Sequence, residues 1–516
     1  MRLADTQEST LPAAIEGATQ RYAELVAVED GDVRLSFREL WQRALGAARA
    51  FLHAGLLPGD RVAIWAPNIW QWFVAAIGLQ TVGGVLVPVN TRYKGIEAAH
   101  VLEKSGARLL LTVEEFLGQR YVELLRSAGV ELPALERIVL LRGKVRDVVP
   151  WEAFLHAGGD VPVELVLQRA RAVAPDDPLD ILFTSGTTGA PKGVVTTHAQ
   201  NLRAFRAWSE IVGLVSGDRY LIVNPFFHAF GYKAGWLSAL LHGVTVLPHA
   251  VFDVSAVLER VARERVSVLP GPPTLYQSIL AHPELRSAEL SSLRLAVTGA
   301  AAIPVVLIER MRSELSFETI ITGYGLTESC GIVSMCRRND DPSTIATTSG
   351  RAIPDVEVRI ADDGEILVRG YTVMRGYFDD AEATLAAIDE QGFLHTGDIG
   401  VLDERGYLRI TDRKKDMFIV GGFNCYPAEI EALMLRHPGI AQVAVVGVPD
   451  ERLGEVGVAF VVARPDAEVS AESVIAFCRD AMANFKVPRR VELVERLPTN
   501  AVGKVTKFVL REWARR

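Results

Sequence analysis

The stretch from Thr184 to Gly193 holds the residues best suited to bind a phosphate group. Its ten positions read Thr-Ser-Gly-Thr-Thr-Gly-Ala-Pro-Lys-Gly, with three glycines, four hydroxyl residues and one lysine. Glycines let backbone N–H groups curve around an anion, hydroxyls add short donors, and a lysine supplies a positive charge. The apolar run 179–183 comes directly before and favours a strand leading into the loop. We therefore predict a phosphate-binding loop.

The Walker A loop is the obvious alternative, and the spacing excludes it. That pattern places a glycine directly before its lysine and a hydroxyl residue directly after it. Here Pro191 precedes Lys192, and Gly193 follows it. An ordinary surface turn rich in glycine and threonine is the other alternative, but it leaves the coincidence of glycines, hydroxyls and a lysine after a strand unexplained. The sequence indicates a phosphate loop of another kind.

A second group of candidate residues follows the apolar run 319–322, in the order Gly-Tyr-Gly-Leu-Thr-Glu from 323 to 328. Tyr324 lies between two glycines, which leaves its ring face open for a planar base. Thr327 and Glu328 add a hydroxyl and a carboxylate. Further along, Asp398 offers a carboxylate that suits a ribose diol, and Arg413 suits the same sugar or a phosphate. The plain alternatives are a turn for the first group and solvated surface charges for the last two residues.

The aromatic segment 224–235 contains His228 and Lys233. A histidine among phenylalanines is more often a satisfied core residue than a catalyst. A lysine is an unusual neighbour for an alkyl chain, because burying an unpaired ammonium is costly. Two interpretations of Lys233 stay open: it turns outward to solvent, or it meets, with Tyr232, ketone or carboxylate oxygens of a polycyclic acid.

These motifs together resemble those of the adenylate-forming superfamily, which includes acyl-CoA synthetases, luciferases and adenylation domains of peptide synthetases. The resemblance covers 184–504. Besides the loop and the tyrosine motif, it rests on ordered matches at 395–398 (His-Thr-Gly-Asp), 412–416 (Asp-Arg-Lys-Lys-Asp), 421–431 and 498–504. Such an ordered series is far more specific than any single motif.

The resemblance implies a role for each matching residue. Lys504 would be the mobile catalytic lysine, Glu328 and Thr184 would bind Mg²⁺, Tyr324 would stack on adenine, and Lys415 would be the hinge between two domains. His228 would form a gate and a wall of the substrate site, not an acid or base. The expected nucleotide and coenzyme A residues are Thr184, Ser185, Gly186, Thr187, Thr188, Gly189, Lys192, Gly299, Ala300, Ala301, Gly323, Tyr324, Thr327, Asp398, Arg413, Gly421 and Gly422. The expected substrate residues are His228, Phe230, Tyr232, Lys233 and Gly325.

The implied reaction is ATP-dependent, AMP-forming acyl-CoA ligation in two steps, with ATP, Mg²⁺ and coenzyme A as cofactors or co-substrates. Three segments, 224–235, 269–276 and 329–336, resemble actinobacterial ligases that act on the propanoate left when steroid rings are opened. A medium-chain fatty or aryl acid ligase is the alternative. A luciferase-like protein, or an adenylate-binding protein without ligase activity, is a more remote one.

Composition sets further limits. The chain has 516 residues, 49% of them hydrophobic and 23% charged, with a net charge of −8. That charge argues against a general nucleic-acid binder. The N-terminal residues lack an apolar signal region and the four cysteines form no C-x-x-C pair, so we expect a cytoplasmic protein without a zinc site. The apolar stretch 62–90 is expected to be strand, amphipathic helix and strand, not a membrane span. The resemblance leaves room for a homodimer.

The expected fold is α/β. Strands alternate with helices over the first 340 residues, which favours βαβ units with largely parallel sheets. Near 347 the pattern changes to two hairpin signals, typical of a small barrel-like subdomain. We predict an N-terminal adenylation domain over 1–412, with this subdomain at 345–411. A mobile α+β C-terminal domain would follow over 413–516, with a short charged hinge near Lys415.

Overall fold

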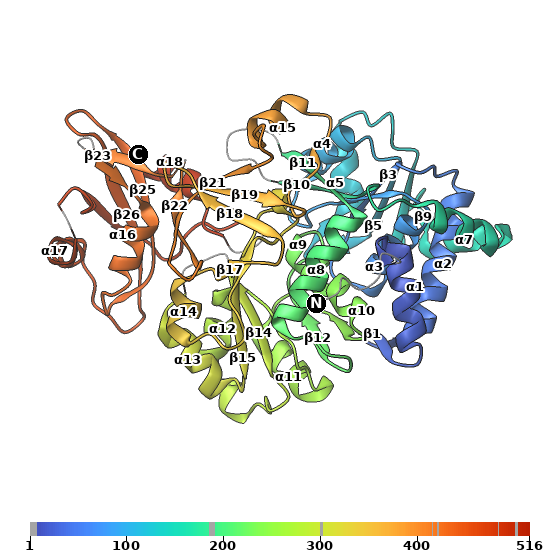
Figure 1. The fold of residues 1–516 in the computed structure, drawn as a ribbon, viewed down its shortest axis with the longest axis horizontal. Helices are drawn as coiled ribbons and strands as arrows, with labels where there is room; N and C mark the ends of the chain where they lie inside the picture. The colour runs from blue at the N-terminus through green and yellow to red at the C-terminus, as the bar shows by residue number, and fades with distance from the viewer. Residues whose placement is uncertain are drawn as a thin grey trace.

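The computed structural model describes residues 8–184, 191–299, 303–414, 416–420, 423–482, 484–500 and 504–515, and for residues 412, 413, 423 and 424 it describes the backbone alone. The mixed α/β fold has a large N-terminal part and a smaller C-terminal part, as the sequence predicts (Figure 1).

An eight-stranded sheet forms the first layer of the N-terminal part. Its central strands are parallel, and β10, β11 and β20 complete one side in antiparallel pairs. In spatial order the strands are β20 (Gly376–Tyr377), β11 (Lys192–Thr197), β10 (Pro178–Thr184), β4 (Val85–Pro88), β3 (Arg61–Trp65), β5 (Leu109–Val113), β8 (Arg137–Arg142) and β9 (Val149–Pro150). A short hairpin, β6 (Glu115–Phe116) and β7 (Gln119–Arg120), lies apart from it.

Two four-stranded groups form the second layer. The first is β12 (Arg219–Ile222), β13 (Thr245–Pro248), β1 (Val26–Asp30) and β2 (Val33–Ser36), and the second is β14 (Leu295–Gly299), β15 (Thr319–Tyr324), β16 (Ser334–Met335) and β17 (Arg351–Ala352). Val268 joins them through single bridges to Tyr220 and Leu295. Around Val268 the pairing is thus limited to one bridging residue.

The helices of this part cover and separate the sheets. They are α1 (Leu11–Tyr22), α2 (Phe37–His53), α3 (Trp70–Thr81), α4 (Gly95–Ser105), α5 (Tyr121–Ser127), α6 (Trp151–Ala157), α7 (Val163–Ala172), α8 (His198–Val212), α9 (Ala229–Gly231), α10 (Ser238–Leu241), α11 (Val254–Glu264), α12 (Pro273–Leu280), α13 (Val305–Glu314) and α14 (Pro342–Thr347). A π-helical turn, η3 (Tyr232–Leu237), joins α9 to α10.

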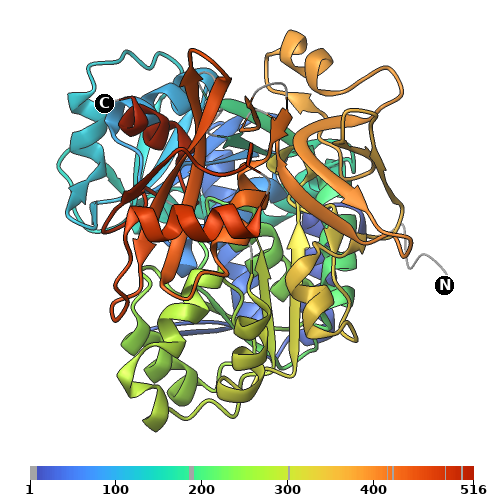
Figure 2. The same cartoon turned by 90° about the vertical axis from the view of Figure 1, so that its left-hand side faces the viewer.

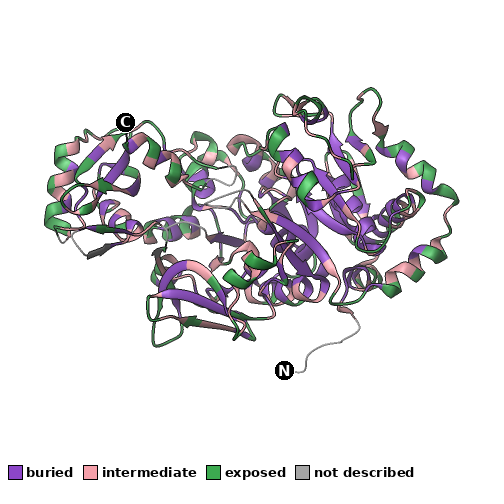
Figure 3. Cartoon of the chain, turned by 90° about the horizontal axis from the view of Figure 1, so that it is seen from above, coloured by how far each residue is buried: buried purple, intermediate pink, exposed green. Residues whose placement is uncertain are grey.

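Helix α3 corrects one expectation. Its twelve residues are all buried, so the helix is buried on every face and has no polar side facing solvent. It packs against α1, α2 and α7 and follows β3 directly, so it has no solvent face to make polar. Among the described residues no helix is long and apolar enough to cross a membrane. Buried residues gather in the strands and in the helices between layers (Figure 3).

A four-stranded antiparallel sheet follows, formed by β18 (Val356–Ile360), β19 (Glu365–Gly370), β21 (Leu394–Leu402) and β22 (Leu408–Arg413), with α15 (Ala381–Ala387) beside it. Both expected hairpins are present, as β18–β19 and β21–β22. Strand β21 carries Asp398, which is the reason this sheet matters for the site.

In the C-terminal part the described residues form a five-stranded sheet and three helices. These are β23 (Phe418–Val420), β24 (Phe423–Cys425), β25 (Ile440–Asp450), β26 (Gly454–Ala463) and β27 (Arg490–Leu493), with α16 (Pro427–Met434), α17 (Ala471–Ala481) and α18 (Lys507–Ala514). The apolar clusters of the C-terminal part hold residues from Phe418 to Ala514. They are separate from the N-terminal core, whose last buried residue in the chain is Leu408. Figure 2 shows this part in front of the N-terminal layers.

Candidate active site

The predicted phosphate loop lies at the tip of the β10–β11 hairpin. Thr184 pairs with Lys192 as the last registered pair, and the Thr184 hydroxyl lies 3.5 Å from the Lys192 carbonyl. Lys192 is exposed, and its ammonium lies 5.0 Å from the ring centroid of Tyr377. The hairpin therefore presents a hydroxyl and a positive charge at the base of the loop. Residues Ser185, Gly186, Thr187, Thr188 and Gly189 lie outside the described residues.

The predicted adenine site lies at the ends of β14 and β15. Gly299 pairs with Gly323, and a Cβ atom on Gly299 would come within 2.6 Å of the Gly323 carbonyl oxygen. The two strand ends are thus too close for a side chain at Gly299. Ala300 and Ala301 lie outside the described residues.

Tyr324 and Asp398 are in direct contact. The Tyr324 hydroxyl donates a hydrogen bond of 2.6 Å to Asp398 Oδ2, and Asp398 is 3% exposed. The sequence suggested separate partners for them, the base and the ribose, and gave no sign of this bond. Strand pairing also sets the backbone of Arg413 opposite Asp398. The structure does not describe the Arg413 side chain.

Glu328 lies in a short 3-10 turn, Thr327–Ser329, beside the phosphate hairpin. One Glu328 carboxylate oxygen accepts a hydrogen bond of 3.1 Å from the Tyr377 hydroxyl. Tyr377 therefore stands between Glu328 and Lys192, and sequence reasoning missed it because only the pairing of β20 with β11 brings it there. Thr327 opens the same turn.

The residues present suit a magnesium ion that is held mainly by phosphate oxygens. Among the described residues no group of three or more His, Cys, Asp or Glu side chains could hold a metal ion. Mg²⁺ commonly uses one or two carboxylates together with substrate phosphates and water. Glu328 can supply such a carboxylate, and the Thr184 hydroxyl is the other predicted ligand.

Gly325 precedes this turn at a point of close backbone approach. A Cβ atom there would lie 2.3 Å from the Gly331 carbonyl oxygen. The residue at this position must therefore lack a side chain if the turn bearing Thr327 and Glu328 is to close.

His228 lies at the start of α9 and accepts a hydrogen bond of 3.2 Å from the Phe230 backbone N–H through Nδ1. Its side chain is exposed in this structure. Desolvation, together with a smaller contribution from the positive charge of Lys504, lowers the pKa of His228 to about 4. The imidazole is therefore neutral at pH 7, in keeping with a wall residue and not a general acid.

Lys504 belongs to a polar turn of the C-terminal part. Its backbone N–H donates to Asn500 Oδ1 at 2.9 Å, and Thr499 bridges Val505 across the turn. The positive charge of Lys504 contributes to the lowered pKa of His228, which indicates that the turn lies on the side of the N-terminal part that carries His228. Lys415, Gly421 and Gly422 lie outside the described residues. The neighbouring Lys414 forms ion pairs with Asp363 and Glu365.

The structure corrects both interpretations of Lys233 and the expectation for Tyr232. Lys233 has no exposed surface, so it does not turn to solvent. Its ammonium lies 3.2 Å from Asp180 Oδ1 and 2.9 Å from the Thr196 hydroxyl, so buried internal partners take the place of a polycyclic acid. Tyr232 is equally buried, stacks on Trp236 at 4.9 Å, and accepts a hydrogen bond from Gln80. The π-helical turn directs both side chains into the core.

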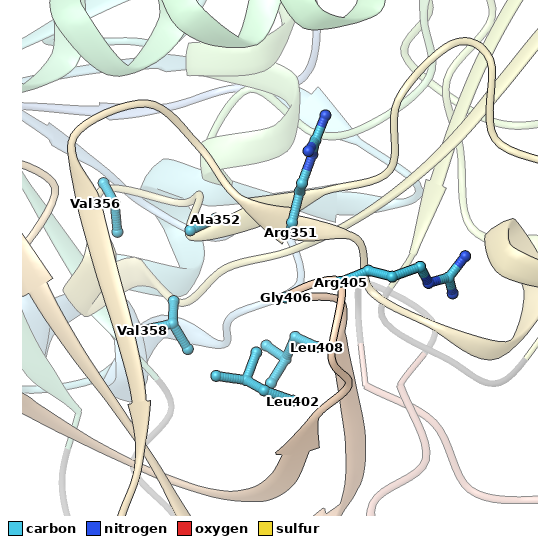
Figure 4. A pocket seen from close by; sticks show the side chains of 8 residues that line it. All are labelled: Arg351, Ala352, Val356, Val358, Leu402, Arg405, Gly406 and Leu408. Atoms are coloured by element: carbon cyan, nitrogen blue, oxygen red, sulfur yellow. The ribbon is translucent and has the colours of Figure 1, made fainter.

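A surface pocket of about 350 Å³ lies away from this site. It is lined by Arg351, Ala352, Val356, Val358, Leu402, Arg405, Gly406 and Leu408 (Figure 4). Leu402 and Leu408 form the turn end of the β21–β22 hairpin, whereas Asp398 lies at its other end. The pocket therefore shares none of the candidate site residues.

Comparison with known families matches most of the chain. Residues 15–378 match the family described as AMP-binding enzyme, and residues 429–504 match the AMP-binding enzyme C-terminal domain. The 3-[(3aS,4S,7aS)-7a-methyl-1,5-dioxo-octahydro-1H-inden-4-yl]propanoyl:CoA ligase of Rhodococcus jostii is 52% identical over 98% of this chain and 99% of its own length.

Two further relatives cover the same length of chain. A mitochondrial medium-chain acyl-CoA ligase of Homo sapiens is 31% identical over 98% of this chain and 87% of its own. The structure of an anthranilate CoA ligase in complex with anthranoyl-AMP superposes with a TM-score of 0.87 at 26% identity, covering 99% of this chain and 98% of the other.

Proposed function

This chain belongs to the AMP-binding enzyme family and is an ATP-dependent acyl-CoA ligase, and we propose that its acid is a propanoate carried by an oxidised ring system derived from a steroid. The observation that carries this proposal is 52% identity, over nearly the whole of both chains, to a ligase named for such an acid.

In the first half-reaction the carboxylate oxygen attacks the α-phosphorus of ATP, and pyrophosphate leaves. Tyr324 and Asp398 hold the adenosine, while Thr184, Lys192 and the loop between them hold the phosphates. Lys504 approaches the reacting carboxylate and α-phosphate, where its ammonium offsets the negative charge that gathers in the transition state. Glu328 would hold Mg²⁺, whose positive charge would neutralise charge on the phosphate oxygens.

In the second half-reaction the coenzyme A thiol attacks the acyl carbon of the adenylate, and AMP leaves. We propose that the C-terminal part rotates about Lys415 between the steps, withdrawing Lys504 and bringing Gly421 and Gly422 to the site. Both steps are displacements between bound substrates, so correct placement does the work of a nucleophilic side chain. A homodimer and a cytoplasmic location stay predictions from the sequence.

A screen of acids for pyrophosphate release tests this proposal. Ring-bearing propanoates with ketone groups, medium-chain fatty acids and aryl acids are compared at equal concentration, with coenzyme A-dependent release of AMP as the second readout. We expect the ring-bearing propanoates to have the highest kcat/KM. A higher kcat/KM for octanoate would favour a medium-chain acid, the specificity named for the human relative.

A further inference from the structure

Five buried polar side chains form a closed ring beneath the candidate site. Four members of this buried polar ring come from four elements, the fifth follows a turn, and each is 0% exposed. They are Asp180 of β10, Thr196 of β11, Asn201 of α8, Lys233 of η3, and Cys330, which follows the turn 327–329.

Short contacts close the ring. The Thr196 hydroxyl donates to Asp180 Oδ1 at 2.6 Å and accepts from the Lys233 ammonium and from Asn201 Nδ2, both at 2.9 Å. The Cys330 thiol donates to Asn201 Oδ1 at 3.3 Å, and the Lys233 ammonium lies 3.9 Å from its sulfur. Burial raises the pKa of Cys330 to about 11, which keeps the thiol protonated as a donor.

The position of each ring member along the chain ties it to a candidate site residue. Asp180 comes four residues before Thr184, and Thr196 four residues after Lys192, on the same two strands. Cys330 comes two residues after Glu328, and Lys233 five residues after His228. The ring thus joins the hairpin that carries Thr184 and Lys192, the turn that carries Glu328, and the segment that carries His228.

Stability alone is a weak reason for such a ring. A buried ion pair loses hydration when it forms, and an apolar replacement of similar volume is often as stable. What a closed ring of directional bonds adds is a fixed placement of the elements that it joins. Because its members are fully buried, they can act on the substrates only through their neighbours.

We propose that the buried polar ring sets the distance between the acyl wall at His228 and the phosphate-binding residues Thr184, Lys192 and Glu328. Lys233 is its central positioning residue, because its ammonium contacts three of the other four members. The inference rests on the proposed function, since it assigns the ring to the alignment of carboxylate with α-phosphate.

The test opens the ring without leaving a buried charge unpaired. Asp180→Asn/Lys233→Met replaces the ion pair with neutral side chains of similar size. The matched control, Asp218→Asn/Arg294→Met, removes another ion pair with a buried aspartate. Arg294 directly precedes β14, so this pair lies at the opposite end of that strand from Gly299. Unfolding temperature, kcat for pyrophosphate release, and KM for ATP and for two acids are measured for both.

We expect the ring variant to lose about 100-fold in kcat, the effect of a misplacement of about 1 Å. KM for ATP should change little, since Tyr324 and Asp398 lie outside the ring, and a ring-bearing acid and octanoate should be affected equally. Lys233→Arg, which keeps the charge, should recover part of kcat. The control should lose thermal stability and keep kcat.

Two results would overturn the proposal. Equal kcat in the ring variant and the control would make the ring a structural feature only, and a selective loss with the ring-bearing acid would make Lys233 a specificity residue. If the double variant does not fold, Thr196→Val and Lys233→Arg decide by the same kcat comparison. Pyrophosphate release by the unaltered chain is measured first, and its absence with every acid would reject the proposed function and not the ring.

Discussion

At the scale of single residues, Lys504 and His228 show how the two parts of the chain share one site. They come from opposite parts of the sequence, and yet the charge of Lys504 lowers the pKa of His228. Because the neighbouring histidine is neutral, it does not repel the ammonium of Lys504. The lysine can therefore approach a bound carboxylate.

Lys504→Ala should abolish adenylate formation and largely spare thioester formation from a preformed acyl-adenylate. Loss of one charge-stabilising contact in the first transition state is worth about 3–4 kcal/mol, or two to three decades in rate. Single-turnover assays of each half-reaction measure the split. Equal loss in both would show that Lys504 is needed for more than the first step.

His198 gives a prediction of pH dependence. It is buried, its Nδ1 accepts the Leu11 backbone N–H at 3.1 Å, and desolvation lowers its pKa from 6.5 to about 4. Between these values the unfolded chain binds a proton that the folded chain does not, so stability falls as pH falls from 6.5 towards 4. At pH 5 the loss from this group should be about 2 kcal/mol.

His198→Gln keeps an acceptor and removes the titration, so its stability should fall less between pH 7 and pH 5. Urea unfolding followed by tryptophan fluorescence measures this, since seven of the eight tryptophans precede residue 240. His156→Gln, at an exposed position of α6, is the matched control and should behave like the unaltered chain. The same pH slope in all three would contradict the assignment.

At the scale of elements, the site depends on where strands and turns end. The phosphate hairpin, the β14–β15 ends and the turn 327–329 each bring backbone and short side chains to one region. The close approach of Gly325 to Gly331 is the tightest requirement among them.

Gly325→Ala should lower the rate of adenylate formation at least ten-fold (about 1.4 kcal/mol), because the added methyl group forces open the turn with Thr327 and Glu328. Pyrophosphate exchange measures the effect. The control is Gly46→Ala within α2, where a Cβ atom meets nothing within 4 Å and alanine favours the helix. Unchanged exchange in Gly325→Ala would mean that the turn is not part of the site.

At the scale of the whole molecule, the proposed reaction requires the C-terminal part to occupy two positions in turn. In the structure the positive charge of Lys504 acts on His228 of the N-terminal part, and we propose that this arrangement is the one for adenylate formation. Lys414 is anchored to Asp363 and Glu365, so a pivot at the next residue would leave this anchor in place.

Lys415→Pro should allow adenylate formation and block thioester formation. Proline fixes φ near −65° and resists the dihedral change that rotation needs. Acyl-adenylate should accumulate in a single-turnover assay with coenzyme A present. A normal rate of thioester formation would remove Lys415 from the hinge role.

The histidine pKa values offer a second readout of the same motion. When the C-terminal part rotates, the departure of the Lys504 charge should raise the pKa of His228, whereas that of His198 should stay near 4, because Lys504 is not among the causes of its shift. NMR of labelled histidine with adenylate and coenzyme A measures both. In Lys415→Pro the pKa of His228 should stay low.

The sequence by itself determined the fold class through its local patterns, and it determined the reaction through the resemblance of its ordered motifs to the adenylate-forming superfamily. Strand and helix periods and turn residues lie within short windows, so the alternation of strands and helices over the first 340 residues and the two later hairpins, β18–β19 and β21–β22, could be predicted. The spacing of Pro191, Lys192 and Gly193 also excluded a Walker A loop without any structure.

Only the tertiary structure decided which side chains meet. The bond between Tyr324 and Asp398, the place of Tyr377 beside Glu328, and the buried partners of Lys233 all join residues far apart in the chain. A lysine next to aromatic residues gives the same sequence pattern whether its side chain faces a ligand, solvent or a buried aspartate. The desolvation energy of its ammonium depends on Asp180 and Thr196, which only the packing of the β10–β11 hairpin against η3 brings within reach.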